Sequence, residues 1–144
     1  MSRSEYRNLT LGSMLAAGFT LTTSALADQL IIDVTGIDRP GGSIMAAVFD
    51  SAEAWEDNGK AVAVDKDSVY GPSARLIFPN LPAGDYAVKL YHDEDNNGKL
   101  DSNMLGIPSE GFGFSNNPNA LGEPDFEEAA FIINGDTRIE INLN

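Results

Sequence analysis

Apolar and polar side chains alternate with a period of two residues along most of this chain, and this alternation constrains the fold more than any other feature. The alternating sets are Leu30, Ile32 and Val34; Ile44, Ala46 and Val48; Ala74, Leu76 and Phe78; Tyr86, Val88 and Leu90; and Ile139, Ile141 and Leu143. Because successive side chains of a strand point to opposite faces, each set places its apolar residues on one face. We therefore expect strands that each pack on one side.

Turn signals separate the alternating sets. Pro82 and Gly84 lie between the third and fourth sets, and Asn134-Gly135 precedes the last one. Asn-Gly is a strong signal for a tight two-residue turn between paired strands. We therefore expect Phe131 and Ile133 to pair with the last set in a C-terminal hairpin.

A short helix is expected between the second and third sets. Asp50 or Ser51 is suited to cap a helical turn that contains Trp55, and Val62 and Val64 indicate one more short strand. A surface tryptophan can bind a sugar or a peptide, but a lone one on an amphipathic turn is more often packed. Trp55 is therefore expected to cover the core.

Six or seven short strands with regularly spaced turns are typical of an all-β fold. We expect an antiparallel β-sandwich of the prealbumin or immunoglobulin type. Residues 28–144 are enough for one core and not for two, so they are expected to form a single domain.

The segment from His92 to Glu127 carries no convincing strand or helix pattern. A loop of this length is usually functional or disordered. Its apolar residues argue for a loop that is ordered and packed over one end of the sandwich; they are Leu100, Met104, Leu105, Ile107, Phe112, Phe114 and Phe126. Phe112 and Phe114 either present flat faces to a sugar or peptide or plug the open end of the sandwich, and the plug is the favoured role.

The N-terminus has the pattern of a secretory signal peptide. Arg3 and Arg7 precede an apolar run over residues 9–21, and small residues end at Ala25-Leu26-Ala27. The run is shorter than the roughly 20 residues of a membrane-spanning helix. Residues 1–27 are therefore expected to be removed, and the protein to be periplasmic or secreted. With no cysteine, the exported chain has neither a disulfide nor a thiol for lipid attachment.

The charge of the chain limits its partners. The formal net charge is −13 at pH 7. Such a surface repels phosphate backbones and anionic headgroups, so we expect no nucleic-acid partner and no membrane insertion after signal cleavage. Acidity can also serve solubility alone, but cations are the natural small partners of this surface.

Residues 93–101 place oxygen ligands at alternating positions around a glycine. On a twelve-position calcium loop, the ligands at positions one, three, five, seven and nine are Asp93, Asp95, Asn97, the carbonyl of Lys99 and Asp101. Gly98 falls where the loop turns sharply. Oxygen ligands without thiols favour calcium over zinc or copper. The sequence therefore predicts a divalent cation site for calcium in this loop.

The calcium pattern is incomplete at its last position. Met104 stands where a bidentate glutamate belongs, and the flanks have the patterns of a strand and a loop, so this is not an EF-hand. The missing ligand is expected from Glu94, from Glu110 or from the acidic cluster Glu123, Asp125, Glu127 and Glu128. The competing interpretation is a solvated turn whose Asp and Asn side chains bond their own backbone.

Three motifs also carry a resemblance to a known family. They are Phe78-Pro79-Asn80-Leu81-Pro82-Ala83-Gly84-Asp85-Tyr86-Ala87-Val88, the stretch from His92 to Asp101, and the stretch from Gly106 to Asn117. Together they resemble the exported bacterial family known as domain of unknown function 2141. The resemblance implies a signal peptide and one β domain, with no established activity, cofactor or substrate. The turn before Tyr86 is also similar to that of transthyretin-like and carboxypeptidase-regulatory-like β-sandwich modules, which usually bind or scaffold.

Enzyme motifs are scarce in this chain. There is no cysteine nucleophile, no Gly-x-Ser-x-Gly motif and only one histidine. His92 continues the alternation of Tyr86, Val88 and Leu90, so it is expected at the end of a core-facing row. A structural role for His92 is favoured over metal ligation or proton transfer.

The function expected from the sequence is therefore non-enzymatic. It is an exported binding or scaffolding domain with a calcium-stabilised acidic loop and an unknown protein or glycan partner. The alternative is a periplasmic hydrolase that acts on a polysaccharide or peptide through carboxylates of the same loop, for instance Glu110 with Asp93 or Asp125.

Overall fold

A computed structural model describes residues 28–56 and 59–144 of the chain. The expected signal peptide, residues 1–27, lies outside the described residues. Among the helices that are described, none is long and apolar enough to cross a membrane.

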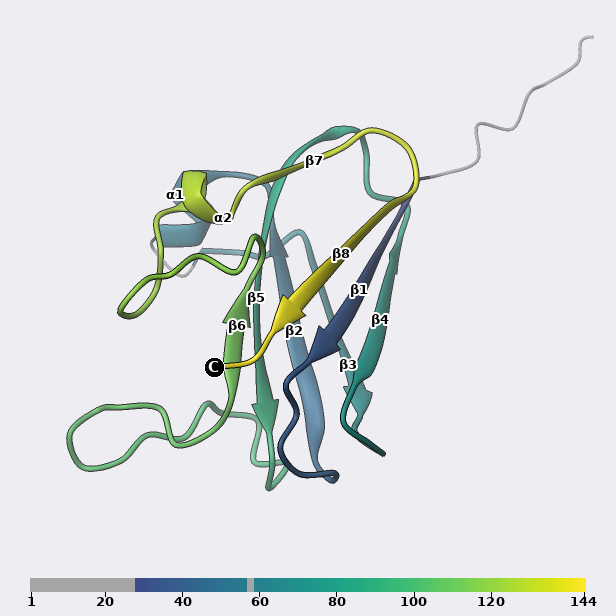
Figure 1. Cartoon of the computed structure of the whole chain (residues 1–144). Coiled ribbons are helices and arrows are strands. Elements are labelled where there is room, and N and C mark those ends of the chain that lie inside the picture. The colour runs from purple at the N-terminus through teal and green to yellow at the C-terminus, as the bar shows by residue number, and fades with distance from the viewer. Residues whose placement is uncertain (1–27, 57–58) are drawn as a thin grey trace, which may run out of the picture.

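The strands form two sheets that face each other (Figure 1). The three-stranded sheet has the order β4 (Ala74–Pro79), β1 (Gln29–Thr35), β8 (Thr137–Asn142). The five-stranded sheet has the order β3 (Ala63–Ser68), β2 (Ser43–Phe49), β5 (Gly84–Asp93), β6 (Phe112–Phe114), and β7 (Phe131–Ile133) also pairs with β5. Every strand pair is antiparallel except β1 with β8, which is parallel. The expected all-β sandwich is confirmed.

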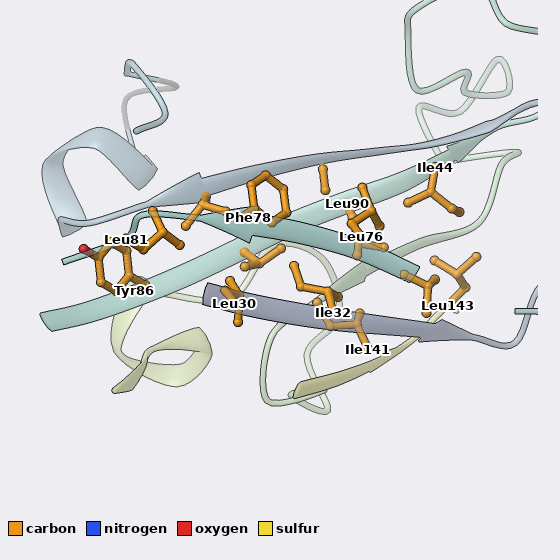
Figure 2. Packing of buried hydrophobic residues seen from close by; sticks show 14 of the residues in the cluster. Leu30, Ile32, Ile44, Leu76, Phe78, Leu81, Tyr86, Leu90, Ile141 and Leu143 are labelled. Atoms are coloured by element: carbon orange, nitrogen blue, oxygen red, sulfur yellow. The ribbon is translucent and has the colours of Figure 1, made fainter. Parts of the chain in front are cut away.

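The core lies between the two sheets, as Figure 2 shows. It is built from the alternating sets of the sequence, and the central members are fully buried: Leu30, Ile32, Val34, Ile44, Val48, Val88 and Ile141. Fully burying one such side chain stabilises the fold by about 1.5–3 kcal/mol. Burial of these alternating apolar residues therefore supplies much of the stability of the fold.

A second, smaller cluster covers part of the outer face of the five-stranded sheet. Helices α1 (Ala52–Glu56) and α2 (Phe126–Ala129) contribute Trp55 and Phe126 to it, over Phe49 of β2. The Ser51 hydroxyl caps α1 by accepting the Ala54 amide at 3.3 Å, as the sequence predicts for Asp50 or Ser51. Trp55 is buried, and its Nε1 donates to the Pro124 carbonyl at 2.9 Å. The expectation that Trp55 packs as a cover is confirmed.

The prediction of a C-terminal hairpin is wrong. Strand β7 pairs with β5 in one sheet, whereas β8 pairs with β1 in the other. The turn at Asn134-Gly135 therefore carries the chain from one sheet to the other (Figure 1). Gly135 has a φ of +94°, so glycine suits this bend even though it does not close a hairpin.

The long segment after β5 contains structure that the sequence did not predict. Strand β6 lies within it and pairs with β5, and α2 begins at Phe126. Between β5 and β6 the chain makes an extended excursion away from the sandwich (Figure 1). This excursion starts at the acidic loop and returns at Glu110.

A candidate cation site in the acidic loop

The acidic loop begins at the last residue of β5. Asp93 lies opposite Ser43 of β2 and is only 2% exposed. Its two carboxylate oxygens accept the backbone amides of Asn97, at 3.0 Å, and Gly98, at 2.9 Å. Gly98 has a φ of +78°, a left-handed conformation that favours glycine. The Asp93 side chain thus holds the turn that follows it.

Asn97 connects the other predicted ligands. Its amide nitrogen Nδ2 donates to Asp95 at 3.2 Å and to both carboxylate oxygens of Asp101 at 3.0 and 2.9 Å. Its side-chain oxygen Oδ1 accepts the Lys99 amide at 2.8 Å. The contact with the Lys99 amide is the Asx-type bond expected of a tight polar turn, and the Nδ2 contacts hold Asp95 and Asp101 on the same side chain.

Glu110 closes the loop from the far end of the excursion. Its Oε1 accepts the Glu94 amide and its Oε2 accepts the Asp101 amide, each at 2.9 Å. The neighbouring Ser109 amide donates to the Asp101 carbonyl at 2.8 Å. Glu110 is 7% exposed, so the loop buries a second carboxylate.

Three carboxylates converge at this point. Asp93, Asp95 and Glu110 each offer one oxygen, and these oxygens all lie within 4.8 Å of one another. Of the five predicted ligands, this group contains Asp93 and Asp95 but not Asp101, whose carboxylate contacts the Asn97 amide. Among the sources considered for a further ligand, Glu110 is the one that the fold brings to the group.

The acidic cluster near α2 lies elsewhere and has other contacts. Glu123 pairs with Lys89 of β5 at 2.5 Å. The Glu128 side chain accepts the Asp125 amide at 3.2 Å, at the start of α2. These carboxylates therefore serve the second apolar cluster and the short helix.

None of the ion pairs of the described residues neutralises the converging carboxylates. Within residues 28–56 and 59–144, the three ion pairs involve Asp33 and Glu123 as acids, and none involves Asp93, Asp95 or Glu110. The local negative charge also acts on Tyr91. Burial raises the pKa of the Tyr91 phenol above its usual value, and the charges of Asp93 and Glu110 raise it further.

Comparison with known proteins places the chain in a family. Residues 32–141 match the model of a family described as "Uncharacterized protein conserved in bacteria (DUF2141)". The chain belongs to this DUF2141 family. The family resemblance found in the motifs is thereby confirmed. No curated protein and no solved structure matches the chain.

The one histidine of this DUF2141 chain is built into the sandwich. His92 is buried opposite Ile44, and its Nε2 lies 2.7 Å from the Gly41 carbonyl oxygen. Its backbone amide donates to the Gly111 carbonyl at 2.8 Å. His92 is not part of the three-carboxylate group, so the contacts of its ring join the turn before β2 to β5.

The structure overturns one of the two roles expected of Phe112 and Phe114, the plug at the open end of the sandwich. Phe112 and Phe114 belong to β6, and their rings lie 5.8 Å apart on the outer face of the five-stranded sheet. They therefore do not plug the open end of the sandwich. The surface that they share with β2 was not predicted from the sequence. The signal for this surface was the unbroken apolar run from Ile44 to Phe49, which places apolar residues on both faces of that strand.

Proposed function

We propose that this protein is an exported, non-enzymatic binding domain whose acidic loop is stabilised by calcium. One observation carries the proposal. Asp93 and Glu110, two buried carboxylates, meet Asp95 with ligand oxygens within 4.8 Å of one another. No basic side chain of the described residues forms an ion pair with them.

The electrostatics of the three carboxylates favour a bound cation. Two unit charges about 4 Å apart interact by about 4 kcal/mol at an effective dielectric constant near 20, and this interaction is repulsive between carboxylates. The backbone amides of Asn97, Gly98, Glu94 and Asp101 offset part of the cost. Each carboxylate oxygen has two lone pairs, so an oxygen that accepts one amide can still coordinate an ion.

The donor set fits calcium better than other common ions. It consists of three carboxylates, and the chain has no cysteine. Calcium accepts six to eight oxygen ligands in flexible geometry, whereas magnesium requires a near-ideal octahedron. The loop is not a complete EF-hand, so we expect weak binding with a Kd on the order of 0.1–1 mM, as in extracellular calcium modules.

The proposed role of the ion is structural. Asp93 ends β5, while Glu110 lies just before β6, so an ion shared by them would join the two ends of the excursion. An ion bound in this way would hold the excursion in one conformation. Its exposed apolar residues, such as Leu105 and Ile107, would then form a surface for a protein or glycan partner. A periplasmic or secreted location suits a site of millimolar affinity, because free calcium is abundant outside the cytoplasm.

Calorimetry and thermal melting of protein stripped with a chelator test the proposal. If the Kd is about 1 mM, 10 mM calcium stabilises the fold by about 1.4 kcal/mol, which raises Tm by several degrees. Magnesium at the same concentration should have a smaller effect. The proposal fails if 10 mM calcium gives neither binding heat nor a shift in Tm.

A matched pair of variants locates the site. Glu110→Gln removes one of the three converging carboxylates, so the calcium-dependent rise in Tm should largely disappear. Glu94→Gln changes the same charge in the same loop but outside the three-carboxylate group, so the rise should persist. Equal loss in both variants would show a general effect of loop charge and would refute a site at Glu110.

A further inference from the structure

An apolar groove lies on the outer face of the five-stranded sheet. The strand register aligns its floor in two rows that run across β3, β2, β5 and β6. The first row is Lys66, Met45, Tyr91 and Phe112, and the second is Val64, Ala47, Lys89 and Phe114. The outer face of a sheet that meets water normally alternates to polar residues. Six of these eight side chains are instead apolar or aromatic.

The groove has the size of a ligand site. The cavity over the two rows has a volume of about 610 Å³ and also contacts Leu100 and Glu123. An adjoining cavity of about 660 Å³ shares Leu100, Phe112, Phe114 and Glu123 with it. The second cavity is bordered by the exposed side chains of Ile107 and Leu121. Mostly apolar cavities of about 300–1,000 Å³ with a few polar groups are typical of small-molecule sites.

The charged residues of the groove differ in their contacts. Lys89 already has partners within the chain. Its Nζ donates to Glu123 at 2.5 Å and to the Trp55 carbonyl at 2.8 Å, and it lies 4.3 Å from the centre of the Trp55 ring. Asp65, the other acidic residue of the lining, accepts the Lys66 amide at 2.8 Å. The Lys66 ammonium forms no ion pair within the part of the chain that the structure describes.

The charged and apolar residues of the groove indicate which kind of ligand it could bind. Lys66 lies on β3, the edge strand, and the apolar floor starts beside it at Met45. With strands about 4.8 Å apart, the row from Lys66 to Phe112 spans about 14 Å. An anionic head at Lys66 would leave an apolar tail lying across β2, β5 and β6.

We propose that this groove binds a single-chain amphiphile with an anionic head, of the fatty-acid class. The carboxylate pairs with Lys66, and the acyl chain lies along Met45, Tyr91 and Phe112 toward Leu100. The proposal names a ligand for the binding domain, and it does not depend on the cation site.

Titration with laurate, dodecanol and dodecyltrimethylammonium below their micelle concentrations tests head and tail together. Trp55 is the only tryptophan and its ring lies 6.0 Å from that of Phe114, so its fluorescence reports binding. Laurate should bind more tightly than the other two. Each methylene removed from the chain should weaken binding about two- to fourfold. Failure of all three to bind, or tighter binding of the cationic amphiphile, would overturn the proposal.

Lys66→Gln tests the head. It should weaken laurate binding about two- to fivefold, the size of an exposed ion pair, and leave dodecanol binding unchanged. Lys60→Gln removes the same charge from an exposed lysine outside the groove lining and should change neither. If Lys66→Gln also leaves laurate binding unchanged, the assignment of the head is wrong.

Val64→Glu tests the tail. Val64 is 72% exposed, so the fold should tolerate the change, but the new carboxylate enters the groove and should weaken laurate binding at least about tenfold. Ile77→Glu on β4 of the other sheet is the control, and both variants are checked by Tm.

Each titration is run once with calcium and once with a chelator. A variant that loses laurate binding but keeps its calcium response separates the amphiphile proposal from the calcium proposal. Concentration-dependent dimers that Val64→Glu abolishes, without laurate binding, would show a second copy in the groove and refute the amphiphile.

Discussion

Ser115 donates its hydroxyl proton to the carbonyl oxygen of Ala129 at 2.5 Å. The same hydroxyl oxygen accepts the Val88 amide at 2.9 Å, and Ser115 is fully buried. One side chain therefore satisfies polar backbone groups from β5 and from α2. It joins the second apolar cluster to the centre of the five-stranded sheet.

Ser115→Ala should destabilise the protein by about 1–3 kcal/mol, because two buried backbone groups lose this partner. Urea unfolding measures the effect, and Ser73→Ala at an exposed position should change stability by less than about 0.5 kcal/mol. A loss below 0.5 kcal/mol for Ser115→Ala would mean that other groups take over both bonds.

Asp33 predicts a pH dependence of stability. Its carboxylate receives hydrogen bonds from Arg75 at 2.7 Å and Arg138 at 2.5 Å. Burial acts to raise the pKa of Asp33, but the two arginines outweigh it and hold the pKa below its ordinary value of 3.8. The folded state thus binds a proton less readily than the unfolded state. The contribution of Asp33 is complete well above pH 3.8 and is lost as the pH falls through the folded pKa.

Asp33→Asn should lower stability at pH 7 by up to about 1 kcal/mol, since both arginines are largely exposed. The difference in the free energy of unfolding between Asp33→Asn and the unmodified protein should become smaller near pH 3. Urea midpoints at the two pH values measure this, with the exposed Asp85→Asn as a control. A difference that grows on acidification would contradict the sign of the pKa shift.

Gly113 lies where β6 approaches β8. An added Cβ would lie 2.7 Å from Ile141 Cγ2 and 3.0 Å from the Asn142 carbonyl oxygen. Gly113→Ala should therefore cost about 1–3 kcal/mol through displacement of β8. Gly71→Ala, which meets no atom within 4 Å, should be tolerated. Thermal melting of both variants checks the contrast, and equal Tm values would show that β6 can move away freely.

The sequence was informative where the determining interactions are local. Leu30, Ile32 and Val34 face the core because side chains alternate along any strand, whatever its partners. Trp55 and the Ser51 cap follow from a few neighbouring residues. The loop from Asp93 to Asp101 likewise bonds mainly within itself, so its turn could be predicted from spacing.

Features that depend on distant partners could not be predicted in the same way. Asn134-Gly135 has the local chemistry of a hairpin, but β8 pairs with β1 in the other sheet. Strand β6 is only three residues long, and its Phe-Gly-Phe pattern shows alternation only once Gly113 is placed against Ile141. The choice of Glu110 over Glu94 as the third carboxylate depends on the return path of the excursion, which no local spacing encodes.

The parallel pairing of β1 with β8 has a consequence for the order of folding. Leu30 lies opposite Thr137, so β1 receives one of its two neighbours only after the other described strands have been synthesised. Until then β1 has an open edge, which is a template for pairing with other chains. Contacts between residues this far apart in sequence slow folding to the millisecond-to-second range. This chain therefore passes through a period in which its earliest strand needs protection from aggregation.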